Sequence, residues 1–280
     1  MAVTEAPPGA RRPVRAQPAH QRVLNSAPVA IGLYLVIMAG IVYGAYAGAQ
    51  NMGYNWQWYR VPQFIYSHTD DGFQWGEIAL GLVATLNISA LSFLLAVLLG
   101  LVVALMRLSD LVVGPAVAIA FIEFIRNIPL LVLLYLVYYV LGPIFGLDRF
   151  WASVATLAVF HAATIAEILR ASINAVPKGQ WEGAKSIGMS TAQTYRYIVV
   201  PQSIRFMLPP MTGELVQLIK SSAIVSVIAV AELTTVGRNI ISDTYMSFEI
   251  WFTVAAVYMV VTLILSAGVS WLERKYARDA

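Results

Sequence analysis

The sequence predicts an all-α, polytopic membrane protein with six transmembrane helices, and three observations support this fold class. Apolar residues make up 59% of the 280-residue chain, whereas charged residues make up only 12%. The mean hydropathy is +0.71, above the balance typical of a soluble domain. Several apolar stretches reach or exceed the roughly 20 residues that a helix needs to cross a bilayer.

The N-terminal part of the chain predicts a tail and a first span. Residues 1–27 are rich in Pro, Ala and Arg, which is typical of a disordered cytoplasmic tail. The apolar run over residues 28–49 is longer than the core of a signal peptide, and no cleavage site of the Ala-x-Ala kind fits its end well. We therefore expect residues 28–75 to form a retained extra helix and an extracytoplasmic loop.

That loop, from Gln50 to Gly76, is unusually aromatic. Its rings predict either an interfacial aromatic belt at the level of the lipid headgroups or a docking surface for an extracytoplasmic partner. The rings are Trp56, Trp58, Tyr59, Phe64, Tyr66, Phe73 and Trp75.

Five further spans are expected after the loop. Several are longer than the bilayer is thick, so kinks are expected at Pro115 and Pro129. They cover residues 78–106, 111–143, 151–171, 206–231 and 249–271. With the tail inside, most Lys and Arg residues fall on inner segments, and only Arg60, Arg149 and Arg238 fall on outer ones. Both termini and the segment 177–201 are therefore predicted to be cytoplasmic.

We call the segment from Pro177 to Pro201 the elbow, because its pattern predicts a helix, a turn and a second helix. Trp181, Ala184 and Ile187 form an apolar stripe, and Gly188 provides a left-handed stop. The stripe either lies on the bilayer surface or docks against another protein.

A second short helix is expected to follow that turn. Ser190 and Gln193 have the spacing of a capping box, which starts the helix. Pro201 is expected to close or kink it.

Polar residues inside the predicted spans are candidates for a solute path. Glu123 and Arg126 lie one turn apart and form either a structural ion pair or part of the passage. A second group lines one helix and predicts either a helix interface or a solute path. Its residues are Glu214, Gln217, Lys220 and Ser221. A lone His161 is expected to be a packing residue.

Several functions are excluded by absent motifs. The chain has no cysteine, and its three histidines have no ligand spacing, so no metal site is predicted. No basic cluster is dense enough for nucleic acid. No phosphate loop, G-x-S-x-G or H-E-x-x-H motif is present, so we predict a non-enzyme without a cofactor. Any ATP would have to be hydrolysed by another subunit.

The elbow resembles the cytoplasmic loop of ATP-binding-cassette importer permeases, whose pattern is E-A-A, three residues, Gly, nine residues, then I-x-L-P. Gly183 replaces the first Ala of that pattern and Val200 its Leu, and Gly183 should loosen the helix by up to about 1 kcal/mol. The matching residues are Glu182, Gly183, Ala184, Gly188, Ile198, Val200 and Pro201.

The flanking runs resemble the polar amino acid branch of these permeases, which includes histidine, glutamine, glutamate and arginine transporters. FIEFIRNIPLLVLL has Arg126, Asn127, Ile128 and Pro129 where that branch usually has Arg-Gly-Thr-Pro, and KSSAIVS over residues 220–226 is close to K-[DS]-[ST]-[SA]-[LI]-V-S. The resemblance covers residues 76–280 and implies a five-helix importer permease core.

This resemblance implies an assembly and a set of coupling residues. The partners would be a pair of ATPase subunits, a second permease subunit that is identical or homologous, and an extracytoplasmic substrate-binding protein, in a bacterial inner membrane. The coupling residues would be Trp181, Glu182, Gly183, Ala184, Ile187, Gly188, Ile198 and Pro201.

Two other functions stay open at this point: a membrane scaffold that recruits an ATPase without conducting solute, and a membrane enzyme, which lacks any catalytic constellation. The solute would be a polar amino acid, either uncharged or acidic, because Arg126 and Lys220 favour a carboxylate. The candidate path consists of Arg126, Glu214, Gln217, Lys220 and Ser221.

Overall fold

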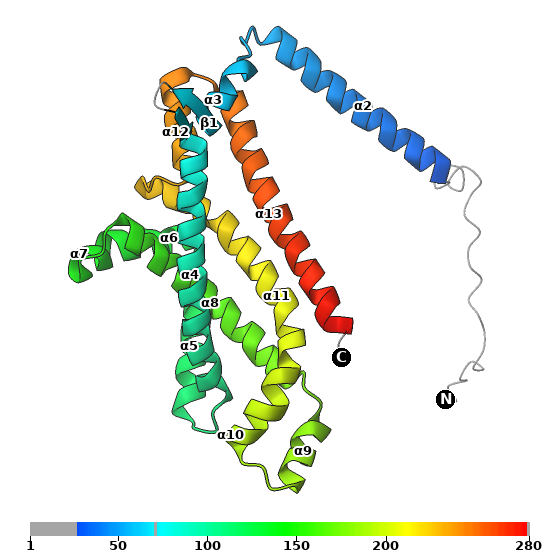
Figure 1. The fold of residues 1–280 in the computed structure, drawn as a ribbon, viewed down its shortest axis with the longest axis vertical. Coiled ribbons are helices and arrows are strands. Elements are labelled where there is room, and N and C mark those ends of the chain that lie inside the picture. The colour runs from blue at the N-terminus through cyan, green and yellow to red at the C-terminus, as the bar shows by residue number, and fades with distance from the viewer. Residues whose placement is uncertain (1–26, 70–71, 279–280) are drawn as a thin grey trace, which may run out of the picture. The chain divides into compact units, whose positions relative to one another are not determined.

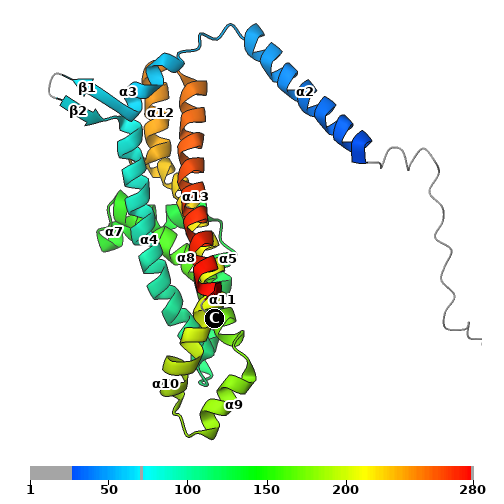
Figure 2. The ribbon, with the colours of Figure 1, turned by 45° about the vertical axis from the view of Figure 1, so that its right-hand side comes forward.

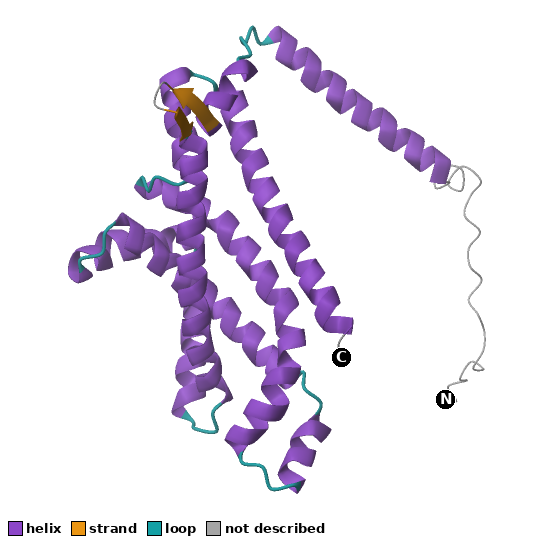
Figure 3. Cartoon of the chain, viewed as in Figure 1, coloured by secondary structure: helices purple, strands orange, loops and turns teal. Residues whose placement is uncertain are grey.

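The computed structural model describes residues 27–69 and 72–278, and these residues are almost entirely helical (Figures 1 and 3). The chain divides into two compact units, residues 1–56 and 57–280. The aromatic segment after Gln57 belongs to the second unit and packs with the helices that follow it. The predicted tail, residues 1–27, lies almost wholly outside the described residues.

The first unit contributes one described helix, α2 (Ala27–Asn51). The helix is apolar over almost its whole length, and none of its residues from Pro28 to Asn51 is buried within the chain. A helix that is apolar on every side suits lipid rather than water. The expected extra N-terminal span is therefore present as a helix long enough to cross a bilayer.

The second unit begins with a short connecting region at one end of a helical bundle. It contains η1 (Trp58–Arg60), α3 (Val61–Ile65) and the hairpin strands β1 (Tyr66–Thr69) and β2 (Gly72–Trp75). The elbow lies at the opposite end of the bundle (Figure 1). The elements that connect these two ends are α4 (Glu77–Leu108), α5 (Val113–Arg126), α6 (Leu130–Tyr135), η2 (Leu136–Leu141), α7 (Gly142–Phe145) and α8 (Arg149–Asn174).

The elbow and the C-terminal helices complete the second unit. They are α9 (Lys178–Ser186), α10 (Thr191–Thr194), η3 (Tyr195–Val199), α11 (Val200–Ser221), η4 (Ser222–Ile228), α12 (Leu233–Thr244) and α13 (Ser247–Arg278).

Five of the described helical stretches are long and apolar enough to cross a membrane, or six when α5 and the α6–α7 segment count as one broken span. This agrees with the predicted six spans. The third span is not one straight helix: its two halves are bent by 103°. The break lies at Asn127 to Pro129, as expected for Pro129. The kink expected at Pro115 is wrong, because Pro115 lies in the first turn of α5, where a missing N–H is tolerated.

The core is built on α4 and α8, whose small residues allow the two backbones to approach closely. A Cβ atom on Gly100 would lie 2.7 Å from the Cγ2 atom of Ile165 and 3.1 Å from the carbonyl oxygen of Ala162. Ala96, Ala104 and Ala158 are also buried at this contact. Small residues are typical of helix interfaces in membranes, where close packing replaces the hydrophobic effect. The arrangement places α8 in the centre of the bundle.

The helix that carries Glu214 and Gln217 ends in a break that the sequence did not indicate. After η4, Ala229 takes a left-handed conformation with φ of 57°. Glu232 is fully buried and caps α12 by accepting hydrogen bonds from the backbone N–H groups of Thr234 (2.9 Å) and Thr235 (2.8 Å). The hydroxyl of Tyr258 also donates to Glu232 at 3.0 Å. The expected span 206–231 therefore ends at Ile228, and a separate helix follows it.

Candidate functional site: the elbow and a polar helix face

The turn of the elbow has the backbone geometry that its sequence predicts. Gly188 has φ of 77°, and its N–H donates to the carbonyl of Lys185 at 3.0 Å. The N–H of Met189 donates to the carbonyl of Ala184 at 3.1 Å. These two bonds form a Schellman motif, which satisfies carbonyls at the end of α9. Only glycine adopts this conformation without strain.

The second half of the elbow begins with the predicted capping box. The backbone N–H of Ser190 donates to Oε1 of Gln193 at 2.8 Å, and the N–H of Gln193 donates to Oγ of Ser190 at 3.4 Å. Pro201 does not close this helix, since helical structure runs from Thr191 to Ile228. A π-helical turn, η3, precedes the proline, and such a turn accommodates the missing N–H.

The apolar stripe of the elbow does not form one outward face. Ala184 is buried, and the ring of Trp181 packs edge-on against Tyr195 with centroids 5.2 Å apart. Trp181 and Tyr195 cover a cluster of buried residues at the end of the bundle, Ile173, Val176 and Val199.

Ile187, by contrast, is 77% exposed. The expectation that all three residues dock a partner is therefore wrong for Ala184, which is buried, and Trp181 turns mainly inward. The apolar spacing correctly indicates a face that is buried, but here the second half of the elbow buries it and not a partner protein.

The other expected coupling residues lie mostly at the surface. Glu182, Gly183, Gly188 and Pro201 are exposed, and Ile198 is partly exposed. The elbow therefore presents a mostly polar surface, and Ile187 is the most exposed of its large apolar side chains, followed by Tyr197 at 59% and Val200 at 42%. This surface has a fixed backbone because the Schellman motif and the capping box hold both sides of the turn.

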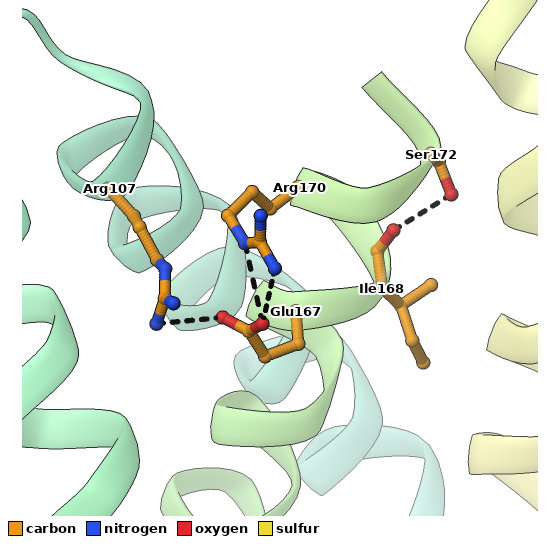
Figure 4. A network of polar contacts seen from close by, with 5 residues as sticks. All are labelled: Arg107, Glu167, Ile168, Arg170 and Ser172. Atoms are coloured by element: carbon orange, nitrogen blue, oxygen red, sulfur yellow. Dashed lines mark hydrogen bonds and ion pairs between the residues drawn. The ribbon is translucent and has the colours of Figure 1, made fainter. Parts of the chain in front are cut away.

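A charged cluster lies towards the elbow end of the bundle, where the last turn of α4 meets α8 (Figure 4). Glu167 accepts from Nη1 of Arg107 at 3.0 Å and from Nη2 of Arg170 at 2.8 Å. Each of these side chains is only about a quarter exposed. Two cations therefore share one carboxylate, and the cluster carries a net positive charge.

Glu167 also lines a cavity of about 430 Å³, which we call the Arg126 cavity. Its walls come from α5, α8 and α11 and include Arg126, Thr164, Phe206 and Pro210. Pro210 cannot donate to the carbonyl of Phe206, which leaves a backbone acceptor beside this cavity.

The expected ion pair between Glu123 and Arg126 is not formed. Nδ2 of Asn127 instead donates to the Glu123 backbone carbonyl at 2.7 Å and to its Oε2 at 3.5 Å. None of the ion pairs among residues 27–69 and 72–278 includes Arg126. Arg126 therefore lines a cavity without an ion-pair partner in this part of the chain, which leaves its guanidinium available to a ligand.

Glu214 pairs with a residue that the sequence did not indicate. Nδ1 of His161 on α8 lies 2.6 Å from Oε1 of Glu214 on α11. The His161 side chain is 1% exposed and that of Glu214 is 13% exposed. The pair crosses 53 positions of the sequence. His161 is therefore buried, as expected, but it also holds a polar partner on the candidate path.

Three further path residues meet in a second cavity of about 600 Å³, which we call the Lys220 cavity. Gln217, Lys220 and Ser221 line it together with Leu130 and Ser226. The carbonyl of Ser226 accepts from Nη2 of Arg238 at 2.9 Å. The structure thus brings three of the five candidate path residues into one cavity, and it places Arg126 in the other cavity.

One face of α11 links these features. Phe206 and Pro210 line the Arg126 cavity, Glu214 follows one turn later, and Gln217 and Ser221 line the Lys220 cavity. Successive spacings of three or four residues keep side chains on one side of a helix. Over these positions α11 rises by roughly 22 Å at 1.5 Å per residue, a large part of the bilayer core.

The residues that sequence reasoning missed are His161, Glu167, Arg107 and Arg170. A buried charge in an apolar span is itself a signal of a partner, and Glu167 with Arg170 has the spacing of a pair on one helix. The contacts between α4 and α8 and between α8 and α11 could not be predicted without knowledge of how the helices pack.

Comparison with known proteins finds a family and several relatives. Residues 116–278 match the family model described as "Binding-protein-dependent transport system inner membrane component". The chain is 36% identical over 201 residues to the probable glutamine ABC transporter permease protein GlnM of Bacillus subtilis, covering 71% of this chain and 93% of that protein.

Two other curated relatives have similar coverage. The glutamine transport system permease protein GlnP of Escherichia coli K12 is 36% identical, with 72% of this chain and 94% of that protein covered. The octopine transport system permease protein OccM of Rhizobium radiobacter is 34% identical, with 73% and 89% covered.

A solved structure described as an amino acid ABC transporter with histidines is also similar. It is 42% identical, with a TM-score of 0.67, and the match covers 71% of this chain and 94% of that one.

Proposed function

This chain belongs to the family of binding-protein-dependent transport system inner membrane components, and from that premise we propose that it imports a polar amino acid as the permease subunit of an ATP-driven transporter. The relatives named as permeases of glutamine and octopine support this class of solute. They do not support the scaffold alternative. The single observation that carries the coupling role is the elbow, whose rigid turn exposes Glu182 and Ile187 at one end of the bundle.

The proposal assigns ATP hydrolysis to a partner, because the chain has no phosphate-loop motif of its own. A pair of ATPase subunits would dock on the cytoplasmic elbow, and their closure would move the helices to which the elbow is joined. Both termini of the permease would then lie in the cytoplasm, and an extracytoplasmic binding protein would deliver the solute at the hairpin end.

A second permease subunit, identical or homologous, is also part of the proposal. In this chain the exposed face of α11 leaves Gln217 and Lys220 uncovered. A path through the membrane needs walls on all sides, since lipid does not tolerate open polar groups. Another copy of this core would supply the missing wall.

The polar face of α11 is the proposed solute path. Lys220 and Arg126 each line a cavity, and neither belongs to an ion pair within the described residues. Such cations attract the carboxylate that every amino acid carries, and they favour an uncharged polar or an acidic amino acid over a cationic one.

The coupling role is tested with the transporter reconstituted in vesicles together with its ATPase and binding protein. Gly188→Asp places a Cβ and a charge at a left-handed position, so we expect loss of substrate-stimulated ATP hydrolysis and of uptake. Gly179→Asp is the matched control, because Gly179 is also exposed in α9 but has no positive φ.

A Cβ atom added at either glycine would have no neighbouring atom within 4 Å, so steric clash does not distinguish the two variants. Substrate-stimulated hydrolysis that stays normal in Gly188→Asp would refute the coupling role. Equal loss in both variants would show that charge, and not the turn, is responsible.

A further inference from the structure

The hairpin formed by β1 and β2 has two chemically different faces. Its register pairs Tyr66 with Trp75 and His68 with Phe73. Paired residues share a face, and side chains two apart on a strand share it too, so these four rings lie together. Ser67 pairs with Gln74 on the opposite face. One face is therefore aromatic and the other is polar.

The four rings form a continuous surface. Phe73 lies in the middle, with centroid distances of 5.0 Å to Trp75, 5.7 Å to His68 and 6.4 Å to Tyr66. Tyr66 is 50% exposed, Phe73 53% and Trp75 63%. No Asp, Glu, Lys or Arg stands at these four positions. A two-stranded hairpin with such a face is marginal in water by itself and gains stability when the face is covered.

The base of the hairpin is fixed to the bundle, so its direction is set by the fold. The N–H of Gly76 donates to the carbonyl of Ile65 at 2.9 Å. A Cβ atom on Gly76 would overlap the backbone carbonyl of Phe64, so only glycine fits there. Val61 before the hairpin and Ile78 after it are buried in one cluster with α12 and α13 residues.

The hairpin directly precedes a helix that is long and apolar enough to cross a membrane. Trp75 precedes Glu77, the first residue of α4, by two positions, and α4 is a candidate membrane span. Figure 2 shows the hairpin projecting sideways from the end of α4, across the direction of the helices. The first turns of α4 expose Leu80 and Val83, apolar side chains that suit the acyl chains beside them.

We propose that the aromatic face of the hairpin lies on the bilayer and occupies the phospholipid headgroup layer. Aromatic rings without charged neighbours are typical of that layer, where an apolar ring body and a polar tip are both accommodated. The sideways direction of the hairpin and the exposed apolar side chains on the first turns of α4 favour lipid over a binding protein, which would approach the end of the bundle.

The absence of cysteine in the chain makes a direct test possible. Single variants Phe73→Cys and His68→Cys carry a fluorescent label on the aromatic face, and Gln74→Cys and Ser67→Cys are the matched controls on the polar face. The assembled transporter is placed in phosphatidylcholine vesicles, and quenching by lipids with a nitroxide near the headgroup is compared with quenching by iodide in water.

The proposal predicts several-fold stronger lipid quenching at positions 73 and 68 than at 74 and 67, with the opposite order for iodide. Adding substrate-loaded binding protein should leave quenching at 73 and 68 unchanged. Iodide quenching at all four positions would overturn the proposal. Protection of 73 and 68 that appears only with the binding protein would assign the face to that protein instead. Equal quenching by the lipid nitroxide at all four positions would also overturn the proposal. Substrate-stimulated ATP hydrolysis by each labelled variant serves as the control for correct assembly of the transporter.

Discussion

The elbow and the charged interior of the bundle hold their polar groups in different ways. In the elbow, the turn is fixed by bonds between near neighbours, such as Gly188 to Lys185 and Ser190 to Gln193, and its charged side chains are exposed. In the interior, Glu167 and Glu214 are held by residues from other helices, Arg107 and His161. The elbow can therefore move as a rigid piece, whereas the interior ties the spans to one another.

The largest expected difference between the two regions is in stability. Glu167→Gln leaves Arg107 and Arg170 without their carboxylate at partly buried positions. We expect a loss of about 2 kcal/mol, between the values for exposed and fully buried pairs. Glu182→Gln, on the exposed elbow, is the matched control and should change stability by less than about 0.5 kcal/mol. Thermal unfolding in detergent measures the melting temperature of both variants. Equal decreases in melting temperature would contradict the expected difference between the charged cluster and the elbow.

A second, smaller effect concerns the pair between α8 and α11. If His161 and Glu214 interact directly, removing either should largely cancel the cost of removing the other. A double-mutant cycle with His161→Ala and Glu214→Ala should give a coupling energy of about 1.5 kcal/mol. Additive losses of stability would show that the 2.6 Å contact contributes nothing. The same cycle with Glu182→Ala in place of Glu214→Ala should be additive.

The smallest stability effect is expected in the elbow itself. Gly188→Ala should cost about 1 kcal/mol because alanine is strained at positive φ, whereas Gly183→Ala should stabilise α9 by up to about 1 kcal/mol. Both glycines are exposed and have room for a methyl group, so the pair isolates backbone conformation. Chemical unfolding of the purified subunit measures the change in the free energy of unfolding for each variant. A change of the same sign in both variants would contradict the left-handed turn at Gly188.

The difference between local contacts in the elbow and contacts between helices in the interior explains what could be predicted from the sequence. The spans, the turn at Gly188 and the capping box at Ser190 depend on local patterns, and the structure confirms them. The partners of Glu167 and Glu214 depend on helix packing, which a pattern on one helix does not contain. The inward position of Ala184 was missed for the same reason, since its cover comes from the second half of the elbow.

The candidate path shows an intermediate case. Gln217 and Ser221 were recognised because polar residues at helical spacing are costly in lipid, and the structure places both on one cavity. The sequence could not show that Arg126 lines a separate cavity, because the 103° bend after α5 determines its position.

The most direct measurement of the coupling role is site-specific cross-linking between the elbow and the ATPase. The cysteine-free chain permits single variants Ile187→Cys and Glu182→Cys on the exposed surface, with Ala184→Cys as the buried control. The proposed function predicts that a short bifunctional reagent links positions 187 and 182 to the ATPase, and that the yield changes with ATP. No link at 187 or 182, or equal links at 184, would contradict the elbow as the dock.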